Sequence, residues 1–100
     1  MKLTQSKQAD TLTITLEGRL DSVTAPDLEK ALEDLGGATH LIFDFAALDY
    51  VSSAGLRVLL KTQKTINATP GADMKIIHVN DTVNEVFEVT GFTGILTTEK

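Results

Sequence analysis

Hydrophobic residues along this chain follow two patterns that predict strands. Residues 41–45, LIFDF, are an almost continuous apolar run, typical of a central strand buried on both faces, which we expect over residues 40–45. In residues 11–17, leucine and isoleucine alternate with threonine and glutamate, as in a half-buried strand, and Gly18 is expected to end it. Weaker patterns predict further strands over residues 2–8, 74–79 and 94–97.

Apolar residues at helical spacing predict a first helix. They recur at i, i+3, i+4 and i+7 between Leu28 and Leu35, which gives the helix one apolar face. Thr24 stands where a hydroxyl can cap the start of this helix, and Gly36-Gly37 is expected to end it.

Two more helices are expected in the second half of the chain. One spans residues 53–67 and follows a pair of adjacent serines. The other begins near Thr82, which has the spacing of a capping box with Glu85, and ends at Gly91.

The order of these elements predicts an α/β fold. A strand–helix–strand alternation implies right-handed crossovers and parallel pairing, whereas the first two strands, joined by a tight turn at Ala9-Asp10, should be antiparallel. We therefore expect a single domain over residues 1–100, with a mixed, mostly parallel sheet of four to five strands and three main helices.

Composition narrows the classes of partner. Of the 100 residues, 42% are hydrophobic and 23% charged, which suits one folded domain. Nine basic and 14 acidic residues give a net charge of −5, so neither nucleic acid nor an anionic membrane is expected as a partner. Cysteine is absent, which excludes disulfides and thiolate metal sites. No signal peptide or membrane-spanning run is evident, so we expect a cytoplasmic monomer.

The candidate chemistry lies in loops that follow the strands. Residues 18–24, 44–53 and 79–82 are predicted loops, and the first two should meet at the carboxyl ends of parallel strands. Asp21 would then lie on one surface with Ser52 and Ser53. A serine hydroxyl at a helix start can serve as an N-cap, and a phosphate there would be favoured by the helix dipole and the free N–H groups.

Catalysis by this chain is not expected. A serine nucleophile needs an oriented base, and Ser53 lacks the Gly-x-Ser-x-Gly context. His40 and His78 are interpreted as ordinary strand-end residues that no carboxylate pairs with.

Two motifs resemble those of a known family. Residues 50–60, YVSSAGLRVLL, resemble the signature of STAS domains, in particular the bacterial anti-sigma factor antagonists. Residues 18–21, GRLD, followed by Thr24 and Ala25, match a second element of that family. Together with the order of elements, the resemblance covers nearly all of the chain and implies one STAS-like domain.

In that family, the unphosphorylated antagonist binds a kinase-type anti-sigma factor and so releases the sigma factor. The kinase phosphorylates the antagonist on a serine with ATP, the complex dissociates, and a phosphatase resets the switch. Matching Gly55-Leu56 to the family's Gly-Leu places the acceptor at Ser53. The family often has Asp at the preceding position, and the hydroxyl of Ser52 makes that residue the second candidate.

The resemblance also implies a set of partner-binding residues and no catalytic residue, metal or cofactor. The set comprises Asp21, Thr24, Ser52, Ser53, Gly55, Leu56 and Arg57. Within the same fold, an alternative is a stand-alone interaction subunit that is never phosphorylated, for example in a lipid-transport or stress-sensing complex.

Overall fold

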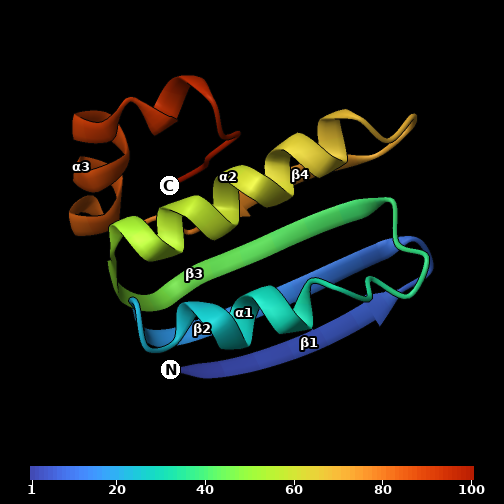
Figure 1. Cartoon of the computed structure of the whole chain (residues 1–100), viewed down its shortest axis with the longest axis horizontal. Coiled ribbons are helices and arrows are strands. Elements are labelled where there is room, and N and C mark those ends of the chain that lie inside the picture. Colours follow the sequence, from blue (N-terminus) through green and yellow to red (C-terminus); the bar gives the residue numbers. More distant parts are fainter.

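Four strands form one mixed sheet in the computed structural model, which describes all residues from Met1 to Lys100. Their order across the sheet is β1-β2-β3-β4. The first pair is antiparallel and the other two pairs are parallel, as expected. The strands are β1 (Lys2–Gln8), β2 (Thr11–Leu20), β3 (His40–Val51) and β4 (Asp73–Ile77) (Figure 1).

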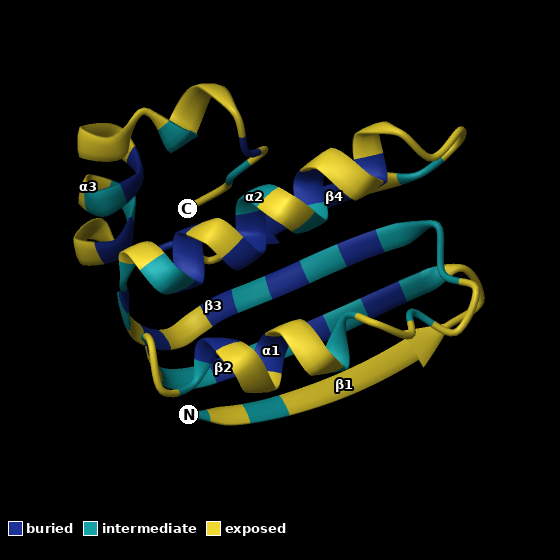
Figure 2. Cartoon of the chain, viewed as in Figure 1, coloured by how far each residue is buried: buried dark blue, intermediate teal, exposed yellow.

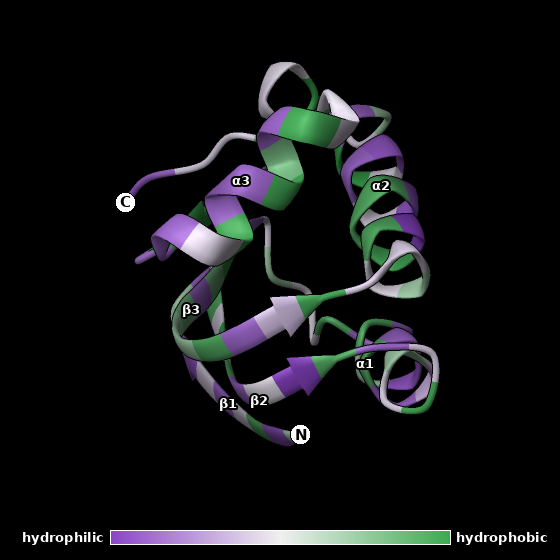
Figure 3. Cartoon of the chain, turned by 90° about the vertical axis from the view of Figure 1, so that its left-hand side faces the viewer, coloured by the Kyte–Doolittle hydropathy of each residue, from purple (hydrophilic) through white to green (hydrophobic).

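Three α-helices accompany the sheet, and this arrangement confirms the predicted fold class. Helices α1 and α2 lie on the same side of the sheet, whereas α3 lies near the end of β3 (Figures 1 and 3). The helices are α1 (Ala25–Ala31), α2 (Ser53–Asn67) and α3 (Asp81–Thr90), followed by the short 3-10 helix η1 (Phe92–Gly94).

The central strand β3 is buried on one face only, which corrects the prediction of a strand buried on both. Leu41, Phe43 and Phe45 are buried, whereas the alternate residues Ile42 and Asp44 are half-buried. Leu12, Ile14 and Leu16 of β2 are buried on the same face, as the alternation predicted. The edge strand β1 is exposed over most of its length (Figure 2).

Strands β2 and β3 are both longer than predicted. Gly18 does not end β2, because its backbone adopts φ +95° at a shift of register and the strand continues to Leu20. In β3, the Asp44 carboxylate accepts a hydrogen bond from the Ala46 amide at 3.0 Å beside another register shift, and the strand continues to Val51. The predicted loops at residues 18–24 and 44–53 are therefore much shorter in the structure.

Several helix ends and the last strand also differ from expectation. Helix α1 ends at Ala31, well before Gly36-Gly37. Helix α3 is capped by Asn80, whose side chain accepts from the Val83 amide at 2.9 Å, so the proposed capping box of Thr82 and Glu85 is wrong. Gly91 ends α3 in a left-handed conformation, as predicted. The chain end adds one parallel bridge, Ile76 to Thr98, instead of a fifth strand.

A close contact between β2 and α2 gives the first prediction. A Cβ added to Gly55 would lie 2.7 Å from Leu20 Cγ, inside contact distance. We expect Gly55→Ala to lower the free energy of unfolding by about 1–3 kcal/mol, because overpacking outweighs the gain of about 0.5–1 kcal/mol that alanine normally brings to a helix. Urea denaturation would measure this.

Gly94→Ala is the matched control, because a Cβ there would meet nothing within 4 Å. A Gly55→Ala variant as stable as the unmodified chain would show that the contact relaxes without cost.

Candidate functional site

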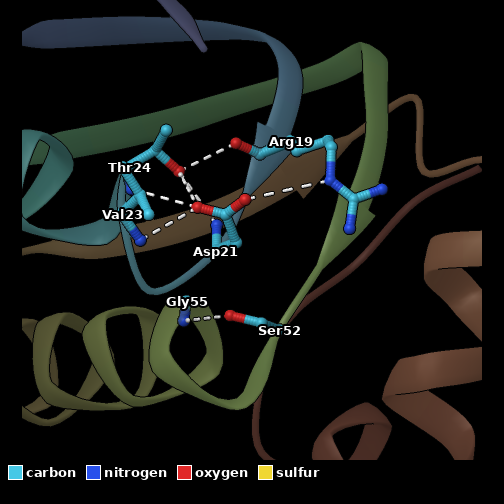
Figure 4. A network of polar contacts seen from close by, with 6 residues as sticks. All are labelled: Arg19, Asp21, Val23, Thr24, Ser52 and Gly55. Carbon is cyan, nitrogen blue, oxygen red and sulfur yellow. Dashed lines mark hydrogen bonds and ion pairs between the residues drawn. The ribbon is translucent and has the colours of Figure 1, made fainter.

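The ends of β2 and β3 bring the two predicted site segments together. Leu20 and Val51 are register partners in the parallel pair, and the Ser52 amide donates to the Leu20 carbonyl at 2.8 Å. The turn that contains Asp21 therefore lies beside the turn that contains Ser52 (Figure 4). This is the juxtaposition expected from parallel strands.

The two adjacent serines have different surroundings. Ser52 is the N-cap of α2, and its hydroxyl accepts from the Gly55 amide at a long 3.4 Å. Ser53 is the first residue of the helix, is exposed, and its hydroxyl makes no hydrogen bond within the chain. The first turn of α2 contains no acidic residue. The Ser53 hydroxyl is thus accessible at a helix start whose dipole and unpaired N–H groups favour negative charge.

Asp21 organises the turn between β2 and α1. Its Oδ1 atom accepts from the Val23 amide at 3.0 Å and from the Thr24 amide at 3.1 Å, as Figure 4 shows. The side chain is 30% exposed, and its Oδ2 atom lies 3.8 Å from Arg19 Nε. Oδ1 therefore holds the turn through two amides, while Oδ2 has only the longer contact with Arg19.

Thr24 does not cap α1, which corrects the prediction made from its position. Its hydroxyl donates to the Arg19 carbonyl at 2.8 Å and accepts from the Asp21 amide at 2.9 Å, and it makes no capping bond to the helix. Asp21 has a structural role in this turn through its bonds to the Val23 and Thr24 amides, and a partner contact by Asp21 stays a prediction.

Hydrogen bonding keeps Asp21 ionised. The Thr24 amide is the main cause that lowers the pKa of the Asp21 carboxyl below 3.8. Desolvation opposes this shift, whereas the Val23 amide, the Thr24 hydroxyl and the Arg19 charge support it. The Arg19 guanidinium also lies 4.4 Å above the Tyr50 ring, a cation–π contact that sequence reasoning missed.

Both histidines pair with carboxylates, contrary to expectation. His40 Nδ1 lies 2.9 Å from Asp73 Oδ1, and His78 Nδ1 lies 3.0 Å from Asp44 Oδ1. Burial raises the pKa of Asp44, but the Ala46 amide and His78 outweigh it, so the net shift is downward. These pairs connect β3 to the strand and turn that follow it in the sheet, and neither includes a residue of the serine turn.

The other predicted partner-binding residues divide between core and surface. Gly55 is buried against Leu20, and Leu56 is only 6% exposed. Arg57 is exposed. Gly55 and Leu56 are therefore buried under the start of α2 and are not part of its exposed surface.

None of the helices is long and apolar enough to cross a membrane, and no group of three or more potential metal-ligating side chains is present.

Comparison with known proteins establishes the family. The model of the STAS domain matches residues 2–100, so the chain belongs to the STAS domain family. A Bordetella bronchiseptica protein named as a proposed anti-sigma factor antagonist, BtrV, is 37% identical over 97 residues, which cover 95% of this chain and 83% of that protein. The anti-sigma-B factor antagonist of Staphylococcus aureus is 27% identical over 83% of this chain and 78% of its own length.

Solved structures agree on the fold. The anti-sigma factor antagonist SpoIIAA in its unphosphorylated form superposes with a TM-score of 0.82 at 20% identity, over 99% of this chain and 89% of SpoIIAA. An anti-sigma factor antagonist from Mycobacterium paratuberculosis gives a TM-score of 0.86 at 19% identity, over 98% of this chain and 84% of that one.

The Asp21 network gives the second prediction. We expect Asp21→Ala to lower the melting temperature at neutral pH by roughly 5 °C, because two loop amides lose their acceptor. Asp21→Asn keeps one acceptor oxygen and should lose less. Because folding lowers the pKa of Asp21, its stabilisation is present above pH 3.8 and is lost as the pH falls through the folded-state pKa.

Circular dichroism melts from neutral to strongly acidic pH would measure both effects. The difference between Asp21→Asn and the unmodified chain should shrink on the acid side. An Asp21→Ala variant with an unchanged melting temperature would contradict the structural role.

Proposed function

We propose that this chain is a cytoplasmic anti-sigma factor antagonist that works by partner switching. Unphosphorylated, it binds a kinase-type anti-sigma factor. The kinase transfers the γ-phosphoryl group of ATP to Ser53 Oγ, a base of the kinase takes the hydroxyl proton, ADP is left, and the complex dissociates. A phosphatase then hydrolyses the O–P bond and returns the serine and inorganic phosphate. The names of the curated relatives support the antagonist role.

The accessibility of Ser53 carries this proposal. Its side chain is exposed and its hydroxyl makes no hydrogen bond within the chain, so a kinase can reach it without unfolding the domain. Ser52 is half-buried and its hydroxyl accepts from the Gly55 amide, so a kinase reaches it less readily than the exposed, unbound hydroxyl of Ser53. Ser53 is therefore the better acceptor of the two.

Charge explains how one phosphate releases the partner. Phosphorylation adds about −1.5 to −2 charges near neutral pH, at a helix start that has no acidic residue before the modification. An interface fitted to a neutral serine must then desolvate that charge. A cost of about 2–5 kcal/mol, roughly 30- to several-thousand-fold in affinity, is enough for a switch.

The proposed partner surface surrounds Ser53. It includes Ser52, the half-exposed side of Asp21, Thr24 and the exposed Arg57. Gly55 and Leu56 contribute by placing the start of α2 against β2. No nucleic acid, membrane or cofactor is needed.

The third prediction concerns the acceptor. Incubated with the anti-sigma kinase and ATP, the chain should gain one phosphate, and tandem mass spectrometry should place it on Ser53. Ser53→Ala should abolish labelling. Ser52→Ala is the matched control and should still be labelled, because only a long capping bond is lost.

Phosphate on Ser52 alone would overturn the choice of acceptor. Stable binding to a partner complex with no phosphorylation by any copurifying kinase would favour the alternative, a STAS subunit that is never phosphorylated.

The fourth prediction concerns the switch. Ser53→Asp should bind the unmodified partner roughly 5- to 30-fold more weakly than wild type, because a carboxylate supplies part of the phosphate charge. Ser53→Asn has nearly the same shape without the charge, so it should bind close to wild type, as should Ser53→Ala. Isothermal titration with ADP present would measure the affinities. Equal weakening by Asp and Asn would show that size, and not charge, governs binding.

A further inference from the structure

Helix α2 carries only positive charges. Its 15 residues include Arg57, Lys61 and Lys64 and no aspartate or glutamate, although the chain as a whole has a net charge of −5. Lys61 Nζ is bound to Glu29 at 2.9 Å. No carboxylate pairs with the Arg57 guanidinium in any of the ion pairs of the structure. Arg57 is therefore an exposed cation without an anionic partner.

Arg57 follows Ser53 by four residues on the same helix. Side chains at this spacing are neighbours on the helix surface, with Cβ atoms about 5–6 Å apart. An acidic group that precedes a basic one at this spacing has the favourable orientation. A phosphate on Ser53 would thus project toward the one unpaired arginine of this surface, whose planar guanidinium can bind two phosphate oxygens.

Other groups nearby already have partners. Arg19, the other arginine at this end of the sheet, lies over the Tyr50 ring at 4.4 Å and near Asp21 Oδ2 at 3.8 Å. Glu29, which lines the same shallow groove as Arg57, is engaged by Lys61. Neither group competes strongly for a phosphate–Arg57 pair.

We propose that Arg57 binds the phosphate of phosphorylated Ser53 within the same chain. This inference rests on the proposed modification of Ser53 and adds a second component to the switch. In the unphosphorylated chain, Arg57 is free to meet an acidic group of the partner. After phosphorylation, the partner meets a new negative charge and also loses Arg57, which the phosphate has bound.

The fifth prediction tests this pair without a kinase. Phosphoserine is incorporated at position 53 during synthesis of the full chain, and phosphorus NMR follows its second ionisation, which ordinarily has a pKa near 6. Arg57 should stabilise the dianion, so Arg57→Ala should raise that pKa by about half a unit. Arg57→Lys, which keeps the charge without the planar fork, should raise it less.

Lys64→Ala is the matched control. Lys64 is also exposed and unpaired on α2, but it follows position 53 by 11 residues, about 16 Å along the helix and beyond the screening length of about 10 Å at moderate salt. It should leave the phosphate pKa unchanged. An Arg57→Ala curve that coincides with the unmodified one, or an equal shift in Lys64→Ala, would overturn the proposal.

The same sample separates this inference from the proposed function. If the phosphoserine chain shows the Arg57-dependent shift but binds the anti-sigma factor as tightly as the unphosphorylated chain, the switch fails and the pair stands. If binding is lost on phosphorylation but the shift is absent, the switch stands without Arg57.

Discussion

The contact of Leu20 with Gly55 is the constraint on which the site depends. A Cβ at position 55 would come within 2.7 Å of Leu20 Cγ and 3.1 Å of the Leu20 carbonyl oxygen, so the first turn of α2 packs directly against the last residue of β2. The same carbonyl accepts the Ser52 amide at 2.8 Å. Packing and hydrogen bonding together fix the start of α2 relative to the turn that contains Asp21. Any larger residue at position 55 would move Ser53, the proposed acceptor, away from that turn.

At this end of the sheet, neighbouring polar groups differ in whether they are hydrogen-bonded within the chain. Ser52 caps the helix while the Ser53 hydroxyl is unbound, and one oxygen of Asp21 holds two loop amides while the other faces Arg19. At each of these two places, one group holds the local fold and its neighbour is left less engaged. A modification of Ser53 can change the surface charge without removing a hydrogen bond that the fold requires.

The sequence predicted the elements better than their ends. The alternation of apolar and polar residues located β2, and the helical spacing of apolar residues located α2 and α3. Each of these elements buries one apolar face, and this pattern is present along its length whatever residue ends it. The prediction that β2 ends at Gly18 was wrong, because a glycine can either end a strand or allow a shift of register within it. Pairing with β3 decides between the two, and that pairing cannot be read from the local sequence. The pairs His40–Asp73 and Asp44–His78 span 33 and 34 residues, and their proximity depends on the register of neighbouring strands. The start of α2 at the serine pair was predicted correctly, whereas the caps predicted at Thr24 and Thr82 were wrong, because neighbouring polar residues compete for the same helix amides and turn contacts.

Because the N-cap of α2 is the uncharged Ser52, the start of this helix carries no negative charge. An aspartate there, as the family often has, would cap the same amide and bring a negative charge beside Ser53. With Ser52 as the cap, the first turn of α2 is free of carboxylates, and the nearest charge along the helix is Arg57. Phosphate on Ser53 would then be the first negative charge on this helix, and it would not have to overcome repulsion from an adjacent aspartate. The neutral cap therefore favours both the addition of the phosphate and a large difference in surface charge between the two states.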